Sequence, residues 1–387
     1  MPYIHRLLEK ELKESARGFP VLILTGPRRS GKTTLLRRHF PKASYYLLED
    51  LDTIARIKSD PRSFLESLAP PVILDEIQNT PELLNYIRTQ VDLSGRKRTE
   101  WLLTGSQEPA LMKGVSESLA GRAAIFHLLP FSNAESSKVT VFSGGFPEIV
   151  TEQARPETWF RSYLQTYLER DIRSVSSIRD LATFRRFLSL VASRIGQVLN
   201  RTDIASPLGI SIPTVTEWLN LLEVTHQIIL VPPFFENFGK RLIKSPKIYF
   251  VDSGLAAHLL GFESESALAR STFSGSLFEN FVASEIVKAQ LNLGKRKELY
   301  FFRDRPGLEV DFVVPLANHR LALIEAKASK TIHPLDALNL NRLMGAVKKY
   351  QVESYVVHPP AKSLKDIEFL SAGVKTVSYA RIPDIIG

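Results

Sequence analysis

Residues 21–33 read Val-Leu-Ile-Leu-Thr-Gly-Pro-Arg-Arg-Ser-Gly-Lys-Thr, and this stretch decides the fold of the first part of the chain. The apolar residues 21–24 predict a buried strand, and residues 34–38 predict the start of a helix. The segment between them fits the phosphate-loop pattern G-x-x-x-x-G-K-[ST] at every fixed position. Glycines let such a loop turn its N–H groups toward phosphate oxygens, and the helix N-terminus adds a positive dipole. The stretch therefore predicts a nucleotide-phosphate site.

Two residues of this loop carry specific predicted roles. Lys32 is expected to reach the β- and γ-phosphates of ATP, and the Thr33 hydroxyl is expected to ligate Mg²⁺. The alternative is a glycine-containing loop that matches by chance, which the flanking strand and helix disfavour. The predicted ATP-binding residues are Gly26, Pro27, Arg28, Arg29, Ser30, Gly31, Lys32, Thr33 and Thr34.

A second apolar strand, residues 70–74, ends in two carboxylates, Asp75 and Glu76. This arrangement matches the Walker B pattern of P-loop NTPases. Asp75 is predicted to hold Mg²⁺, and Glu76 to polarise the attacking water. An acidic pair that merely faces solvent is the alternative, and its position downstream of a phosphate loop makes that alternative the minor one.

Three further residues are candidates for sensing the terminal phosphate or stabilising the transition state. Ser106 or Thr104, at the tip of the next strand, could contact the γ-phosphate, or Ser106 could be a plain turn residue. Arg122 could act as an arginine finger, most often toward a neighbouring subunit, or could be an ordinary surface arginine.

Length and composition limit the class of protein. A chain of 387 residues is long enough for two or three domains, and with no cysteine it has no disulfide or thiolate metal site. No apolar run approaches the ~20 residues of a membrane span, so we expect a cytoplasmic protein without membrane contact. The net charge of +9 favours a nucleic-acid partner, although solvated basic faces are a common alternative.

The middle of the chain has a different pattern. Residues 202–222 predict two short helices joined by a glycine-containing turn, and residues 228–231 predict a strand, as in a winged helix. The second helix carries Thr214, Glu217 and Asn220 but no lysine or arginine. DNA contact and a protein-interaction or lid role therefore both remain open for this module.

The last third carries a second set of acids. Glu279 lies in a helical pattern, Asp311 in a strand, and Glu325-Ala-Lys327 at the end of the following strand. Period-2 geometry places Glu325 and Lys327 on one face, where Asp311 and Glu325 could hold a second divalent metal. Lys327 would activate water or neutralise a scissile phosphate. A structural or DNA-binding domain without turnover is the alternative.

This helix–hairpin–E-x-K order resembles the PD-(D/E)XK core of restriction enzymes and junction resolvases, without its first proline. The whole chain resembles a family of prokaryotic AAA-type ATPases that have a C-terminal domain of unknown function. The resemblance implies an α/β protein with a P-loop AAA-type parallel sheet (residues 1–150), a helical and winged-helix-like module (151–262) and a restriction-endonuclease-like α/β domain (263–387). It also implies a homo-oligomer, such as a hexameric ring, because finger arginines act between subunits.

These features lead to three functional hypotheses. The leading one is an Mg²⁺-dependent ATPase that binds and remodels or processes DNA, with branched or ended DNA among its possible substrates. The second adds metal-dependent nuclease activity at Glu279, Asp311, Glu325 and Lys327. The third is a nucleotide-controlled signalling or defence switch with slow turnover and a protein partner.

Overall fold

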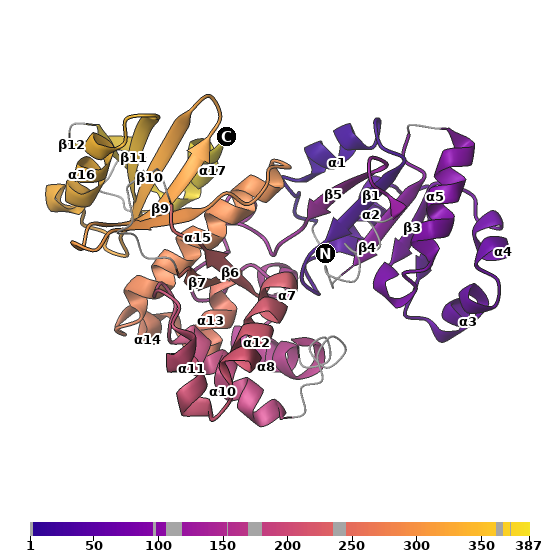
Figure 1. Ribbon diagram of the computed structural model, residues 1–387, viewed down its shortest axis with the longest axis horizontal. Helices are drawn as coiled ribbons and strands as arrows, with labels where there is room; N and C mark the ends of the chain where they lie inside the picture. The colour runs from indigo at the N-terminus through magenta and orange to yellow at the C-terminus, as the bar shows by residue number, and fades with distance from the viewer. Residues whose placement is uncertain are drawn as a thin grey trace.

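The computed structural model shows three regions that follow one another along the chain (Figure 1). The first region contains a parallel sheet, the second is mostly helical, and the third contains a mixed sheet. The structure describes residues 3–95, 98–105, 118–152, 154–168, 180–234, 245–360, 367–371 and 373–387.

In the first region five strands form a sheet in the order β2-β3-β4-β1-β5, and every pairing is parallel. The order places β4 between the strand that leads into the phosphate loop and the strand that ends in Asp75. The carboxyl ends of parallel strands meet at one edge, so the two motifs share that edge. The strands are β1 (Val21–Thr25), β2 (Ser44–Leu47), β3 (Val72–Asp75), β4 (Trp101–Gly105) and β5 (Ala123–His127).

Both faces of this sheet are covered by helices. Successive strand residues point to opposite faces, so Val21 and Ile23 join one core while Leu22 and Leu24 join another. Burial on both faces explains why these strands read as continuous apolar runs. The helices of this region are α1 (Glu9–Ser15), α2 (Lys32–His39), α3 (Leu51–Ser59), α4 (Pro61–Glu66) and α5 (Leu83–Ser94).

The middle region packs helices on a two-stranded antiparallel sheet. Helix α11 (Arg201–Leu208) ends at Gly209, whose φ of 64° forms the left-handed cap, and α12 (Ile212–Val224) begins at the Ser211 N-cap. Pro207 lies inside α11, directly before its last residue. The remaining elements are α7 (Pro147–Glu152), α8 (Pro156–Tyr163), a π-helical turn (Leu164–Leu168), α10 (Leu181–Ala192), β6 (Ile228–Val231), β7 (Lys247–Phe250), α13 (Ser253–Leu259) and α14 (Glu265–Ala269).

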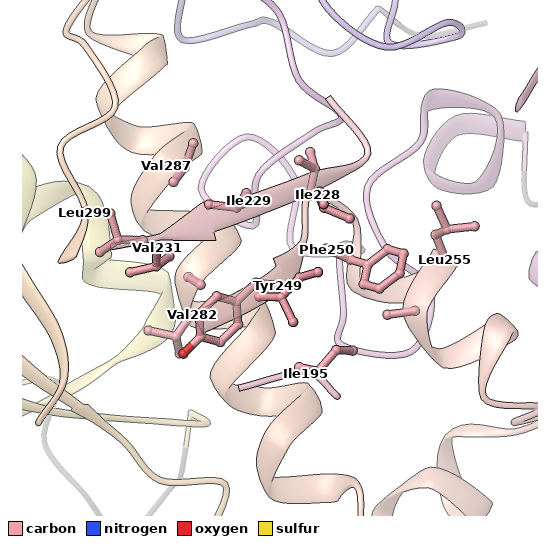
Figure 2. Close-up of a cluster of buried hydrophobic side chains, with 14 of the residues drawn as sticks. Ile195, Ile228, Ile229, Val231, Tyr249, Phe250, Leu255, Val282, Val287 and Leu299 are labelled. Atoms are coloured by element: carbon pink, nitrogen blue, oxygen red, sulfur yellow. The ribbon is translucent and has the colours of Figure 1, made fainter. Parts of the chain in front are cut away.

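Helix α15 (Ser274–Asn292) connects the three regions. It contacts β5 of the first sheet, β7 and α13 of the middle region, and β10 of the last sheet. Its side chains are buried nearly all round, including Glu285 and Lys288, which pair with each other at 3.1 Å. Figure 2 shows the apolar core that Val282 and Val287 of α15 share with the β6–β7 pair. This helix therefore fixes the middle region to the last one.

The C-terminal sheet has the order β12-β13-β11-β10-β9-β8 and mixes parallel with antiparallel pairs. One face packs on α15 within the large core, and the other packs on α16. The elements are β8 (Tyr300–Arg303), β9 (Glu309–Leu316), β10 (Arg320–Ala326), a 3₁₀ turn (Pro334–Ala337), α16 (Leu338–Ala346), β11 (Gln351–His358), β12 (Ile367–Ser371), β13 (Val374–Ser378), a 3₁₀ turn (Tyr379–Arg381) and α17 (Ile382–Ile386).

The predicted fold class is confirmed: the protein is α/β, with a parallel sheet of the P-loop type followed by helices and a mixed sheet. Within the described ranges no helix is both long enough and apolar enough to cross a membrane.

Candidate nucleotide-binding site and C-terminal acidic centre

The phosphate loop lies directly after β1 and depends on two glycines. Gly26 has a φ of 142°, and a Cβ there would come within 2.1 Å of the Leu128 carbonyl oxygen. Gly31 has a φ of 95° and is the N-cap of α2. Both values lie in the region that side chains rarely adopt, so the backbone can curl here only because the residues are glycine. The loop lines a cavity of about 820 Å³ together with the first residues of α2.

Lys32 is the first residue of α2, and its side chain turns back over the loop. Its ammonium donates hydrogen bonds to the carbonyl oxygens of Gly26, at 3.0 Å, and Pro27, at 2.9 Å. A lysine held against these carbonyls is positioned where phosphate oxygens would meet the loop N–H groups.

Asp75 is the centre of a hydrogen-bond network at the end of β3. Its Oδ2 accepts bonds of 2.8 Å from both the Thr33 hydroxyl and the Tyr45 hydroxyl. Its Oδ1 accepts a short bond from the Thr104 hydroxyl on β4. Burial, reinforced by the hydrogen bond to Asp75, raises the pKa of Tyr45, so this tyrosine remains a neutral donor. The carboxylate is therefore fixed in orientation beside Thr33.

Glu76 follows Asp75 with a left-handed backbone, φ 62°, which is unusual for a glutamate. Its N–H donates to the Thr104 hydroxyl at 3.1 Å, and Gln78 donates to its Oε2 at 2.5 Å. An Nη1 of Arg28 lies 3.9 Å from its Oε1. This turn separates the two carboxylates, so that Asp75 faces Thr33 while Glu76 faces the arginine of the loop.

The site is suited to Mg²⁺ and a nucleoside triphosphate. A threonine hydroxyl and a carboxylate are hard oxygen ligands of the kind Mg²⁺ prefers, and they lie within hydrogen-bond distance of each other. Thr33 and Asp75 would hold this ion, while Lys32 and the loop N–H groups would hold the phosphates.

Two arginines tie the loop to more distant segments. Arg29 has a φ of 65°, and its Nε lies 2.7 Å from Oε1 of Glu148 on α7. Arg6 donates to the Ser30 carbonyl at 3.0 Å and pairs with Glu135 at 2.9 Å. The conformation of the phosphate loop is thus connected to the start of the middle region.

Arg122 and Ser106 are the remaining two candidates of the ATPase domain. Arg122 precedes β5, at the sheet edge opposite the phosphate loop, and forms a bidentate pair with Asp92 at 2.6 and 3.0 Å. It therefore cannot serve the nucleotide of its own chain from this position. Ser106 lies outside the described residues. Thr104, the other residue considered for this role, contacts both Asp75 and Glu76.

In the C-terminal domain the four predicted residues lie at one end of the β9–β10 pair. The register that sets Phe312 opposite Ile324 places Asp311 beside Glu325. The Ala326 N–H donates to Asp311 at 2.9 Å, and Lys327 pairs with Glu325 at 2.9 Å. Glu279 reaches the same place from α15, since one ammonium, that of Lys247, lies 3.1 Å from Glu279 and 3.9 Å from Asp311.

A lysine from the middle region occupies this acidic centre. Lys247, the first residue of β7, lies 3.1 Å from Glu279, 2.8 Å from Glu309 and 3.9 Å from Asp311. Burial would lower its pKa, but these carboxylates outweigh burial and raise it, so the ammonium is retained.

Burial and mutual repulsion also raise the pKa values of the carboxyl groups, which favours their neutral forms. Burial, followed by the charge of Asp311, raises the pKa of Glu279 to about 7 and that of Glu325 to about 8. Burial also raises the pKa of Asp311. The expected second divalent metal does not fit this arrangement, because a protein cation already lies among the acids. In the described part of the chain, no three acidic, histidine or cysteine side chains are arranged so that they could hold a metal ion.

Comparison with known sequences agrees with the geometry of the first region. Residues 18–137 match the family model of an AAA domain, and residues 135–266 and 274–375 match two domains of unknown function, DUF8612 and DUF4143. Over 316 residues, which are 79% of this chain and 70% of the relative, the chain is 32% identical to an uncharacterized protein of Mycobacterium tuberculosis. This chain belongs to the same family as that protein. An uncharacterized protein of Haemophilus influenzae is 23% identical over 352 residues, 77% of this chain and 84% of that protein.

The solved structures to which this chain is similar include the following two. The Walker-type ATPase of Pyrococcus abyssi is 18% identical, with a TM-score of 0.41 over 65% of this chain and 94% of that one. The Thermotoga maritima RuvB Holliday junction branch migration motor is 18% identical, with a TM-score of 0.31 over 58% of this chain and 89% of that one.

Several residues of the two sites were not predicted from the sequence. Tyr45 lies in a short aromatic and apolar stretch, and nothing in that stretch indicates that its hydroxyl bonds Asp75. Lys247 ends a run of basic residues, and Glu309 begins a strand, so the local sequence singles out neither of them. Each makes its contact with a residue distant in the sequence, which leaves no local pattern.

Proposed function

We propose that this protein hydrolyses ATP with Mg²⁺ and uses the nucleotide state to bind and remodel DNA. The observation that carries the ATPase part is the network in which Thr33 and Thr104 both bond the carboxylate of Asp75. It joins the phosphate loop, the acidic strand and the strand between them in one preorganised site.

Each residue of the network has a distinct task in this mechanism. Lys32 binds the β- and γ-phosphates, and its positive charge offsets the negative charge that moves to the leaving group. Thr33 and Asp75 would hold Mg²⁺, which would supply positive charge to offset the negative charge of the phosphates. Glu76 orients and polarises the attacking water as a general base. Thr104 fixes both carboxylate-bearing residues, through the Asp75 side chain and the Glu76 backbone.

The DNA part of the proposal rests on charge and on the two remaining regions. The net charge of +9 suits a polyanionic partner. Helices α10 to α12 followed by the β6–β7 pair are interpreted as a winged-helix module. Because α12 has no lysine or arginine, any contact it makes would be to bases more than to phosphates.

The C-terminal domain is interpreted as a restriction-endonuclease-like fold that binds DNA. Its support is the β9–β10 pair with Asp311, Glu325 and Lys327 at one end, flanked by α15. We assign DNA contact, and not cleavage, to this domain, since its acidic centre does not fit a metal ion.

The position of Arg122 supports formation of a homo-oligomer, in a ring or a smaller assembly. This half-exposed arginine lies at the sheet edge away from its own phosphate loop, where a neighbouring subunit's nucleotide could compete with Asp92 for it.

Steady-state ATP hydrolysis tests the proposal, with wild type and Lys32→Ala measured alone and with duplex, single-stranded and forked DNA at two salt concentrations. We expect wild-type hydrolysis that at least one DNA stimulates, more strongly at low salt, and no hydrolysis by the variant. Hydrolysis that no DNA changes, together with no DNA binding at low salt, would contradict the DNA part.

The second candidate function is a slow nucleotide switch with a protein partner. It is favoured by the pairs Arg29–Glu148 and Arg6–Glu135, which connect the phosphate loop to segments outside the sheet. Tight retention of nucleotide through gel filtration, with turnover slower than nucleotide release and no effect of DNA, would support this alternative.

A further inference from the structure

The C-terminal acidic centre contains a positive charge that comes from a different region of the protein. Lys247 of β7 is 2% exposed, and its ammonium lies within 3.1 Å of Glu279 and 2.8 Å of Glu309. Asp311 is the third carboxylate near it, at 3.9 Å. An ammonium with two carboxylates in hydrogen-bond contact takes the place that a metal ion would need among the same oxygens.

The position of Lys247 is fixed by the packing around it. Strand β7 pairs with β6 and packs on α15, and Figure 2 shows Tyr249 and Val282 in this shared core. The Tyr249 hydroxyl donates to Glu279 at 2.5 Å. On another side, a Cβ at Gly196 would lie 3.0 Å from Oε2 of the same glutamate. Glu279 is thus enclosed by the middle region, and Lys247 has little freedom to leave while β7 stays in place.

The centre still has capacity for another cation once the lysine is removed. Glu325 is 9% exposed, Lys327 pairs with its Oε1, and its Oε2 is buried without a hydrogen-bond partner among the described residues. A buried carboxylate oxygen without a partner is costly and is a ready ligand for a cation.

We propose that Lys247 is the resident cation of this acidic centre and excludes divalent metal ions from it. A lysine and a divalent ion cannot share the same carboxylates without strong like-charge repulsion. Metal can therefore bind only if the lysine charge is removed or β7 withdraws from α15. This inference goes beyond the proposed ATPase function: the C-terminal domain remains free of metal while Mg²⁺ acts at the nucleotide site.

Mn²⁺ binding to the nucleotide-free full-length protein, measured by electron paramagnetic resonance, tests the inference. The variants are Lys247→Met, which keeps the aliphatic stem, Lys247→Arg, which keeps the charge, and the double variant Lys247→Met/Asp311→Asn. We expect Lys247→Met to gain a Mn²⁺ site at least about tenfold tighter than any in wild type, and the double variant to lose that site. Lys247→Arg should behave like wild type.

Two results would overturn the inference. One is a well-folded Lys247→Met protein, as judged by near-ultraviolet circular dichroism and normal nucleotide binding, that gains no Mn²⁺ site. The other is Mn²⁺ binding by the wild-type protein at a site that the single substitution Asp311→Asn removes, a result that needs no lysine variant. Equal Mn²⁺ binding by wild type and Asp311→Asn supports the inference even if Lys247→Met does not fold.

Discussion

Replacing Thr104 by valine tests the network at the centre of the candidate nucleotide site. Thr104 is fully buried, and valine has nearly the same shape, so the change removes the hydroxyl without opening a cavity. The substitution thereby removes the hydroxyl that donates to Asp75 and that accepts from the Glu76 N–H. The Glu76 backbone then keeps its left-handed φ of 62° without that hydrogen bond.

The expected effect follows from the two lost hydrogen bonds. A hydrogen bond to a charged group contributes about 1.5–3 kcal/mol, and a buried N–H without a partner costs about 1–3 kcal/mol. The two costs do not simply add, because Glu76 can shift and recover a partner for its N–H. We therefore expect about 2 kcal/mol of destabilisation of the ATPase domain. Since about 1.4 kcal/mol corresponds to a factor of ten, misplacement of Glu76 should lower kcat by roughly 10- to 100-fold.

Urea unfolding and steady-state ATP hydrolysis measure the two effects, with Thr104→Ser as the matched control that keeps the hydroxyl. The serine variant should retain most of the activity, because both hydrogen bonds can still form. If Thr104→Val hydrolyses ATP at the wild-type rate, or if the serine variant loses as much activity as the valine variant, the role given to this hydroxyl is wrong.

Two further predictions concern the loop and the acidic centre. Gly26→Ala places a Cβ within 2.1 Å of the Leu128 carbonyl oxygen, so nucleotide binding measured by fluorescence titration should be lost and the melting temperature should fall, whereas alanine at the unobstructed Gly18 should change neither. Glu325→Gln should raise the melting temperature above pH 8 but not near pH 4, because burial raises the pKa of Glu325 to about 8. The stability that protonated Glu325 contributes is complete below the ordinary glutamate pKa. It is lost as the pH rises through the raised pKa of Glu325 in the folded protein. An equal shift at both pH values would contradict this account.

The parts of the structure that the sequence predicted are those with a local signal. The phosphate loop combines a strand, glycines and a helix start within residues 21–38, so its order and chemistry could be read directly. The acidic end of β3 was predictable for the same reason, because an apolar run that stops at two carboxylates is a contiguous pattern. Strands β9 and β10 each contain a contiguous run of apolar residues, so both could be predicted from a local pattern.

The parts that could not be predicted depend on contacts between distant segments. The pairing of β2 with β3 brings Tyr45 to Asp75, and no feature of residues 44–47 indicates that register. Lys247 occurs in a run of basic residues that would ordinarily face solvent, and only the packing of β7 on α15 brings it to Glu279. A metal site and a lysine-filled site share the same acids, so the sequence of the C-terminal domain could not distinguish them.

ATP binding and ATP hydrolysis measured side by side for wild type and Glu76→Gln test the central claim most directly. The account predicts that the variant binds ATP as tightly as wild type, since Lys32, Thr33 and Asp75 are unchanged, and hydrolyses it at least about 100-fold more slowly. Hydrolysis by Glu76→Gln at the wild-type rate would show that Glu76 does not activate the attacking water and would contradict the mechanism derived from this site.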